Sequence, residues 1–495
     1  MTNTNNIGKE SRQGVYWSVL LKIVHQVYYF SVLIIVARIL GPKDFGVMAL
    51  AMTIISYANN LTSFGLTSAL VQRNTVSKEL IDSVFTFNLA LSFILIPLCI
   101  YLSIPLSTLL KSPDIAIIIP VLTILFPLTS FYSVPMALLR RNLNFRLHSI
   151  IDLIHNFIQS TSMLLLAIGG FGIWSLVYGQ IAGFTATAFV IMLLTKWYPK
   201  LRINLNSLKD VKEYGFWDLV RSHINYIEDY AAYFIISRFL NPAMLGFFDR
   251  ATSISDAPLK RIQVQINAVF FSSFSRLQNE PERLKYALNK SITATSIIST
   301  PLLVGLAITT SHFVNVLLGS VWNPMVIPLM ILSLGGVFKI LNSVFRNINI
   351  AINAYRAQTV ANLASSILYL ILCLIGIKWG IIGVAYATLA SSLLAFIYYG
   401  FLTSRTTRVS WVGIIRSLMP ALTGCLVMAI VLIPLSSLLL KGYTITNLIL
   451  LILAGIVTYV LWILIVPFKD VRIIITDVTG DFKTLLRHTK DKLNK

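Results

Sequence analysis

The chain has 495 residues, of which 56% are hydrophobic and 12% are charged, and its formal net charge is +21. A soluble domain usually carries about 25% charged residues. Apolar stretches of about 20 residues, long enough to cross about 30 Å of hydrocarbon, recur along the whole sequence. The composition therefore excludes a soluble enzyme and predicts a multi-pass membrane protein.

The hydrophobic pattern predicts an all-α fold with about fourteen transmembrane helices. The first apolar run is too long for a cleavable signal peptide and contains Lys22 and His25, so we expect it to remain as the first helix. In chain order the predicted spans cover residues 15–40, 45–70, 83–109, 115–139, 148–169, 172–195, 215–240, 246–272, 288–309, 326–348, 359–377, 381–402, 417–440 and 447–468.

Two stretches 200 residues apart repeat each other after the first and the seventh predicted helix. Arg38–Gly46 reads Arg-Ile-Leu-Gly-Pro-Lys-Asp-Phe-Gly, and Arg238–Gly246 reads Arg-Phe-Leu-Asn-Pro-Ala-Met-Leu-Gly. A second match, Gly172–Tyr178 with Gly380–Tyr386, lies at an offset of 208. Repeated halves are typical of transporters, which place the substrate path between them.

The repeats and the loops divide the chain into five parts, with the boundary between the halves in the charged loop Lys196–Tyr214. The basic tail is interpreted either as an interfacial helix on anionic lipid or as a solvated segment. The predicted parts are a cytoplasmic N-tail (1–14), an N-lobe of helices 1–6 (15–210), a C-lobe of helices 7–12 (211–404), helices 13–14 (405–468) and the tail (469–495).

Basic residues are distributed unevenly between the two predicted sides of the membrane. With the N-terminus inside, the cytoplasmic loops and tails hold 28 Lys and Arg, and the opposite loops hold 6. This bias predicts that both termini are cytoplasmic and that the number of spans is even. The net charge is thus explained by topology, and we expect no nucleic-acid partner.

No pattern in the sequence indicates catalysis or a bound cofactor. There is no phosphate-binding Gly-x-x-x-x-Gly-Lys-Ser/Thr loop and no Cys or His cluster with metal-ligand spacing. Cys99, Cys373 and Cys425 all lie in apolar runs, where buried small hydrophobic residues are the better interpretation than disulfides. We therefore predict no enzyme activity, no metal and no cofactor.

Polar residues within the predicted spans gather on helices 1, 2, 7 and 8, which are equivalent pairs in the two halves. A charge at mid-helix costs about 2.5–3.5 kcal/mol, so such residues usually face a cavity or a partner. The pattern predicts a hydrated cavity between the halves. The predicted substrate-binding residues are Lys22, His25, Gln26, Asn60, Arg221, Asn225 and Arg250, and the predicted ion-coupling residues are Asp218, Glu228 and Asp229.

Several charged residues also have a purely structural interpretation. His155 is expected to be a hydrogen-bonded packing residue, Lys339 and Arg346 to extend toward the membrane surface, and Asp249 and Arg250 to lie near the outer surface. The candidate ion pairs are Asp218–Arg221, Asp256–Lys260, and Asp152 with either Arg146 or His148.

A set of short motifs follows in a fixed order along residues 10–400: Ala37–Gly46, Ser68–Arg73, Val84–Asn88, Pro135–Arg146, Gly170–Gln180, Phe274–Gln278 and Pro281–Arg283. Through this set the chain resembles Wzx-like polysaccharide transporters of the multidrug/oligosaccharidyl-lipid/polysaccharide (MOP) superfamily, in the branch of colanic acid and teichuronic acid exporters. Each motif alone is weak, and the ordered set is specific.

The resemblance implies two six-helix lobes that work by alternating access. It implies a flippase that moves undecaprenyl-pyrophosphate-linked oligosaccharide repeat units to the outer leaflet of the bacterial inner (plasma) membrane, for O-antigen, capsule or exopolysaccharide assembly. It also implies cationic cavity residues, a role assigned here to Lys22 and Arg221. Membrane lipids, a polysaccharide polymerase and chain-length machinery are the implied partners of a monomeric protein.

Two other functions remain open from the residues. A drug/cation antiporter of the same superfamily would need a mainly acidic cavity. A membrane glycosyltransferase or polymerase would usually need a substantial external loop for its chemistry, whereas the longest predicted external loop is Ser311–Met325.

Overall fold

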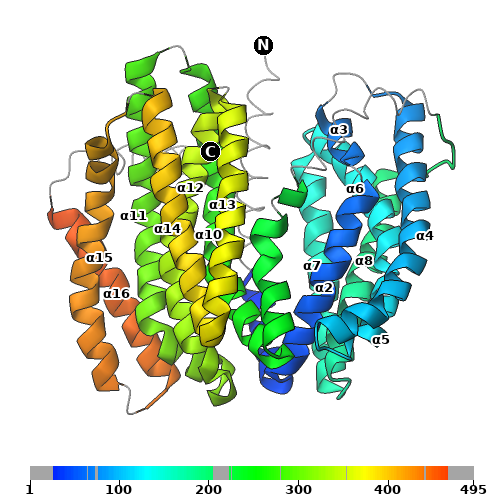
Figure 1. The fold of residues 1–495 in the computed structure, drawn as a ribbon, viewed down its shortest axis with the longest axis horizontal. Coiled ribbons are helices and arrows are strands. Elements are labelled where there is room, and N and C mark those ends of the chain that lie inside the picture. Colours follow the sequence, from blue (N-terminus) through cyan, green and yellow to red (C-terminus); the bar gives the residue numbers. More distant parts are fainter. Residues whose placement is uncertain are drawn as a thin grey trace, which may run out of the picture. The chain divides into compact units, whose positions relative to one another are not determined.

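The computed structural model describes residues 26–63, 65–72, 76–204, 222–224, 226–278, 280–352, 354–407, 409–439 and 442–466. All regular elements in these ranges are helical, and no strand occurs in them (Figure 1). Contacts divide the chain into two compact units, Met1–Asp249 and Arg250–Lys495. The predicted tails at 1–14 and 469–495, and the predicted lobe boundary near 210, lie outside the described residues.

Unit 1 is a helical bundle in which α7 and α8 pack along each other, and α5 and α6 form two halves of one span bent by 40°. Besides a helix over residues 226–239 and the start of α10, its helices are Gln26–Ile39, α2 (Pro42–Ser63), α3 (Leu66–Gln72), α4 (Lys78–Leu109), α5 (Ile115–Leu122), α6 (Leu125–Arg141), α7 (Phe145–Ile168) and α8 (Ile173–Thr195).

Unit 2 packs its helices around buried residues of α11, α12 and α14. Its elements are α10 (Pro242–Arg276), whose start belongs to unit 1, α11 (Pro281–Phe313), η1 (Val314–Leu318), η2 (Ser320–Met325), α12 (Val326–Ala351), α13 (Tyr355–Gly376), η3 (Ile377–Trp379), α14 (Gly380–Thr407), α15 (Trp411–Leu439) and α16 (Ile445–Ile465).

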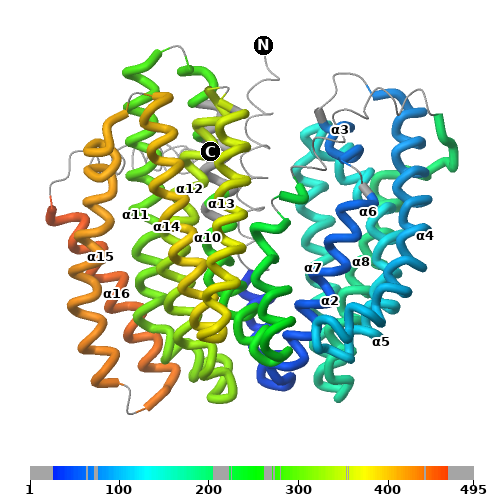
Figure 2. The backbone as a smooth tube through the Cα atoms, viewed as in Figure 1, coloured from blue at the N-terminus to red at the C-terminus, as the bar shows by residue number. Residues whose placement is uncertain are grey.

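The last two helices, α15 and α16, pack on α11 (Figure 2). Met428 and Leu432 of α15 meet Leu451 and Tyr459 of α16 in a buried cluster, and the Tyr459 hydroxyl donates to the carbonyl of Ile297 at 2.9 Å. These contacts fix α15 and α16 to the bundle of unit 2. The three cysteines are free and buried, as their apolar surroundings predicted.

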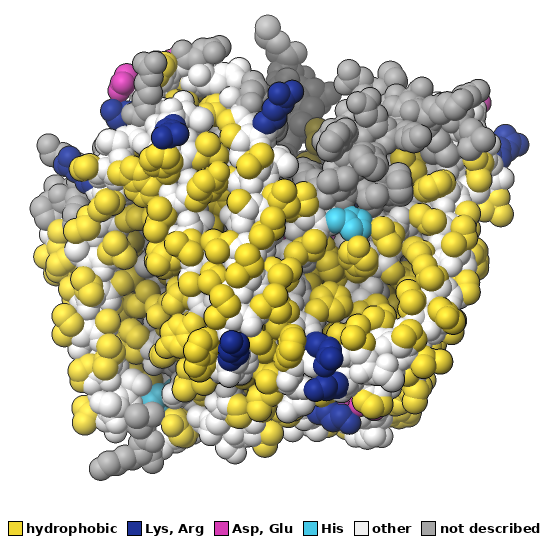
Figure 3. All heavy atoms as spheres, in the orientation of Figure 1, with side chains coloured by type: hydrophobic (Ala, Val, Ile, Leu, Met, Phe, Trp, Pro, Cys, Tyr) yellow, Lys and Arg dark blue, Asp and Glu magenta, His cyan; other side chains and the backbone are white. Residues whose placement is uncertain are grey.

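Nine helical stretches in the described ranges are long and apolar enough to cross a membrane, or ten if the bent pair α5–α6 is one span. One of them, Arg356–Thr407, contains both α13 and α14. Hydrophobic side chains cover the middle of each unit on the face shown in Figure 3, and Lys and Arg side chains lie toward its ends. The chain is therefore a multi-pass membrane protein.

The first sequence repeat has the same local structure in both copies. In the first copy a helix ends at Ile39, the chain bends at Leu40, and α2 begins at Pro42. In the second copy a helix ends at residue 239, the chain bends at Leu240, and α10 begins at Pro242. Proline suits this first helical position because the backbone N–H that it lacks would have no partner there. Leu40 N donates to Val36 O at 2.8 Å, and Leu240 N donates to Ile236 O at 2.8 Å.

The second repeat also matches in conformation. Gly172 precedes α8 with φ 54° and ψ −134°, and Gly380 begins α14 with φ 67° and ψ −155°. Only glycine adopts this region readily, because a Cβ atom would clash with the backbone. Two repeats with matching backbone geometry support the duplication that the sequence predicted.

Candidate functional site

The two copies of the first repeat pack directly on each other in unit 1. A Cβ atom on Gly46 would overlap the carbonyl of Pro242 and lie 2.8 Å from Gly246 N. A Cβ atom on Gly246 would overlap the carbonyl of Pro42 and lie 3.0 Å from Gly46 N. The contact is reciprocal, as expected for two equivalent helix starts that meet. It brings the backbones of α2 and the start of α10 into direct contact.

The exposed side of α2 carries polar as well as apolar side chains, unlike the exposed side of α4. Tyr57 is 40% exposed, and Ser56 and Asn60 are partly exposed on the same helix. On α4, by contrast, the most exposed side chains include Phe93 and Ile104. Ile54 and Leu61 are also partly exposed on this side, so Tyr57 and Asn60 are the polar groups of a mixed surface that suits a ligand with both polar and apolar parts.

Aromatic rings connect α2 to the helix over residues 226–239. Tyr57 lies 5.0 Å from the His223 ring and 5.2 Å from the Tyr226 ring, centroid to centroid. Tyr226 stacks on Tyr230 at 4.5 Å, and Tyr230 lies 5.5 Å from Tyr233. Residues 226, 230 and 233 share one helical face, so their rings form a continuous aromatic ladder.

Two hydroxyl groups of this ladder are bound to neighbouring helices. The Tyr226 hydroxyl donates to the carbonyl of Thr53 on α2, and the Tyr233 hydroxyl donates to Asp249 Oδ1 on α10 at 3.0 Å. The charges within the helices did not predict this ladder. The available signal was tyrosine at positions 226, 230 and 233, spaced four and three residues apart.

Half of the predicted site residues can be located in the structure. Four of them lie in unit 1. Gln26 and Asn60 are partly exposed on the first two helices. In the helix over 226–239, Glu228 is partly exposed and Asp229 is exposed. Arg250, partly exposed on α10, belongs to unit 2. Lys22, His25, Asp218, Arg221 and Asn225 lie outside the described residues. The binding and coupling roles of all ten stay predictions.

The expected intrahelical pair Asp256–Lys260 is wrong, because Asp256 pairs with Lys339 on another helix. Lys339 Nζ on α12 lies 3.1 Å from Asp256 Oδ1 and 2.9 Å from Asp256 Oδ2 on α10. The pair joins two helices that are far apart in sequence. Asp249 is buried and accepts the Tyr233 hydrogen bond, and its expected position near the outer surface of the membrane stays a prediction.

Replacing Lys339 with methionine is expected to destabilise the protein by about 1–2 kcal/mol, because it leaves the mostly buried Asp256 carboxylate without its cation. This value is below the cost of breaking a fully buried pair, since the Lys339 side chain is 46% exposed. Thermal unfolding of the purified variants measures the effect. The double variant Asp256→Asn with Lys339→Met should recover part of the loss, and Lys260→Met should melt like the wild type.

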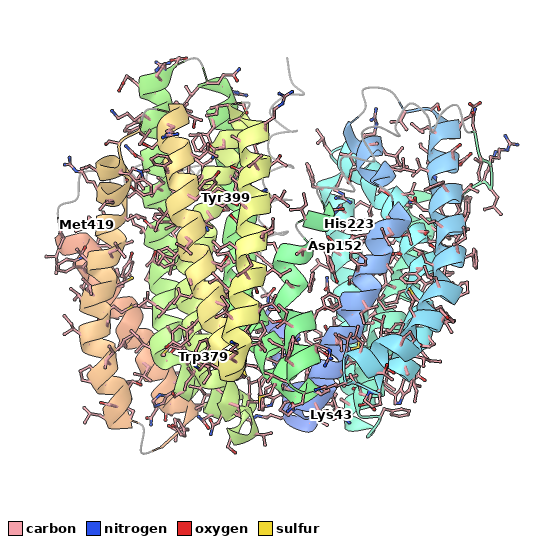
Figure 4. All side chains as sticks on the ribbon, viewed as in Figure 1. Lys43, Asp152, His223, Trp379, Tyr399 and Met419 are labelled. Atoms are coloured by element: carbon pink, nitrogen blue, oxygen red, sulfur yellow. The ribbon has the colours of Figure 1, made fainter. Side chains whose placement is uncertain are left out.

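A second polar cluster joins α6, α7 and α8 in unit 1. Asp152, labelled in Figure 4, lies at its centre. His148 Nδ1 lies 3.1 Å from Asp152 Oδ2, and the Tyr132 hydroxyl donates to Asp152 Oδ1 at 3.2 Å. His155 Nδ1 lies 2.9 Å from Thr187 Oγ1. The predicted Asp152–His148 pair and the hydrogen-bonded packing role of His155 are therefore confirmed. No group of three potential metal ligands occurs in the described part of the chain.

The fold has a counterpart among solved structures. A structure of the lipid II flippase MurJ in an inward closed conformation matches 90% of this chain and 98% of its own with a TM-score of 0.73 at 17% identity. The two proteins therefore share a fold.

The family follows from the sequence comparison. The model of the polysaccharide biosynthesis protein family matches residues 35–327, and the chain belongs to this family. This match, together with similarity to the proteins below, confirms the resemblance to Wzx-like transporters.

Two curated relatives carry descriptive names. The succinoglycan biosynthesis transport protein ExoT of Rhizobium meliloti (strain 1021) is 29% identical over 322 residues, which are 65% of this chain and 65% of that protein. The lipopolysaccharide biosynthesis protein WzxC of Escherichia coli (strain K12) is 23% identical over 340 residues, which are 68% of each. The aligned part thus spans about two thirds of either relative.

Proposed function

We propose that this protein flips undecaprenyl-pyrophosphate-linked oligosaccharide repeat units from the cytoplasmic to the outer leaflet by alternating access, for surface polysaccharide assembly. The observation that carries the proposal is the exposure of Tyr57 and Asn60 on α2 in a member of the polysaccharide biosynthesis protein family. An exposed surface with hydroxyl, amide and aromatic groups suits sugars, which need hydrogen-bond partners when they leave water.

The substrate has three parts with different requirements. The pyrophosphate carries about two negative charges and needs cations or N–H donors. The sugar needs polar and aromatic contacts, and the polyprenyl tail stays in hydrocarbon. A membrane potential that is negative inside favours outward movement of an anion by about 2.3 kcal/mol per charge per 100 mV. Export can therefore run partly on the potential.

The proposal includes a topology. The chain is taken to have fourteen spans in two six-helix lobes followed by α15 and α16, with both termini in the cytoplasm of a bacterial cell. The helices of the described ranges fall on the predicted apolar runs, and the excess of Lys and Arg in one set of loops supports this orientation.

Deletion of the gene from the bacterium that encodes it tests the function. We expect loss of the surface polysaccharide and accumulation of lipid-linked repeat units in the inner leaflet, both reversed by the plasmid-borne gene. Accumulation in the outer leaflet would instead indicate a polymerase. Intact polysaccharide with altered drug resistance would indicate an antiporter.

A further inference from the structure

We propose that Tyr57 and His223 form an aromatic platform on which one sugar ring of the transported oligosaccharide packs. The inference deepens the proposed function and rests on it, because it names the part of the substrate that this surface holds. It starts from the T-shaped contact between the two rings, whose centroids are 5.0 Å apart at an interplanar angle of 77°.

The outer end of the aromatic ladder is accessible and its inner part is not. Tyr226 and Tyr233 are buried, and their hydroxyl groups are bound to Thr53 and Asp249. Tyr57 is 40% exposed, and its hydroxyl makes no hydrogen bond within the described ranges. His223, labelled in Figure 4, is partly exposed. The inner rings therefore hold the helices together, and the outer pair presents a surface.

The Tyr57 ring packs against other side chains of the protein. Tyr226 packs against Tyr57 at 5.2 Å, and its hydroxyl is bound to the carbonyl of Thr53, one turn before Tyr57 on α2. His223 bounds the Tyr57 ring on a second side. A tyrosine has few rotatable bonds, so binding to a ring that is already held costs little conformational entropy.

The surroundings of the platform favour a sugar over a lipid tail. On the same face of α2, Asn60 lies three residues after Tyr57, and Ile54 and Leu61 lie about one turn away on either side, all partly exposed, so the border of the ring is both polar and apolar. A tyrosine that faces hydrocarbon looks different: Tyr101 on α4 is 75% exposed among Leu98, Ile104 and other apolar side chains. A pyranose ring presents C–H groups on one face and hydroxyl groups at its edge, which matches an aromatic face bordered by polar and apolar groups.

The same surroundings disfavour the pyrophosphate. The face of an aromatic ring carries negative partial charge. A phosphate anion is repelled by such a face, whereas the C–H groups of a sugar ring are attracted to it. The platform therefore holds the neutral part of the substrate, and the pyrophosphate binds elsewhere.

Saturation-transfer NMR tests the platform directly. The probe is the repeat-unit oligosaccharide that partial acid hydrolysis releases from the surface polysaccharide of the same bacterium. It is added to the wild-type protein in lipid nanodiscs, and the aromatic protons of the protein are irradiated. We expect saturation on the ring C–H protons of one sugar face. Binding without such transfer, or no binding at all, overturns the platform.

Substitutions at Tyr57 supply the second readout. Tyr57→Phe keeps the ring and should bind and export within about twofold of the wild type, whereas Tyr57→Leu and Tyr57→Gln should lose about fivefold to tenfold in both. Tyr101→Leu, on the lipid-facing side of α4, is the matched control and should behave like the wild type. If Tyr57→Leu or Tyr57→Gln folds and exports normally, the platform is wrong while the flippase stands. If the wild-type gene fails to restore export to the deletion strain, the flippase itself is wrong.

Discussion

Replacement of Gly46 or Gly246 by alanine is expected to remove most of the folded protein from the membrane. Each new Cβ atom would overlap a backbone carbonyl of the opposite repeat, Pro242 O or Pro42 O. A backbone group in a helix start cannot turn away as a flexible side chain can, so α2 and α10 must separate. Overpacking of this kind costs about 1–3 kcal/mol where side chains can adjust, and we expect the upper end here.

Size-exclusion chromatography of a fluorescent fusion, combined with thermal unfolding, measures this loss. Gly41→Ala is the matched control, because Gly41 precedes the same helix and a Cβ atom there meets nothing within 4 Å. The two damaging substitutions act on one crossing, so the double variant should lose less than the sum of the single losses. Wild-type melting of both single variants would show that the repeats do not touch in the membrane.

The sequence predicted the helices well because long apolar runs in a membrane protein have few alternatives. Backbone groups in hydrocarbon must bond within their own segment, so a run of about 20 apolar residues becomes a helix. The repeat of Arg38–Gly46 by Arg238–Gly246 also predicted equivalent local structures, which the matching bends and prolines confirm. It did not predict that the copies touch, because spacing along a chain carries no information on contacts between helices.

Contacts between charged side chains could likewise be predicted within one helix but not between helices. Helical spacing identified Asp152 with His148, which are neighbours within one helix. The same rule suggested Lys260 for Asp256, whereas the actual partner, Lys339, is on α12. The partner of a charged group in the membrane depends on which helix packs against it, and that depends on the shapes of both surfaces. The contact between Tyr57 and Tyr226 was not predicted for the same reason.

The exposed residues of unit 1 distinguish two environments that composition alone cannot separate. On α4 the exposed side is apolar, as lipid requires, and on α2 it carries Tyr57 and Asn60 beside apolar side chains. A duplicated transporter needs one face of each half to stay wet during transport. Tyr57, Asn60 and the Gly46 crossing all belong to one helix, α2, which begins at Pro42.

Replacement of Lys22 or Arg221 by alanine is expected to abolish polysaccharide export while the protein level stays normal. Both cations are predicted from the sequence to bind the pyrophosphate of the substrate. A hydrogen bond to a charged group is worth about 1.5–3 kcal/mol, or roughly tenfold to a hundredfold in affinity, and more where water is excluded. The membrane potential cannot replace these contacts, because it drives an anion outward only after the anion has entered the protein.

Export is measured as surface polysaccharide in the complemented deletion strain, beside the amount of each variant in the membrane. Lys22→Arg and Arg221→Lys keep the charge and should retain part of the activity, although the planar guanidinium and the ammonium are not equivalent. Lys43→Ala is the control, since Lys43 pairs with Asp114 at 3.0 Å on an exposed surface where such pairs contribute little. Normal export by both alanine variants would mean that these two cations do not carry the substrate charge.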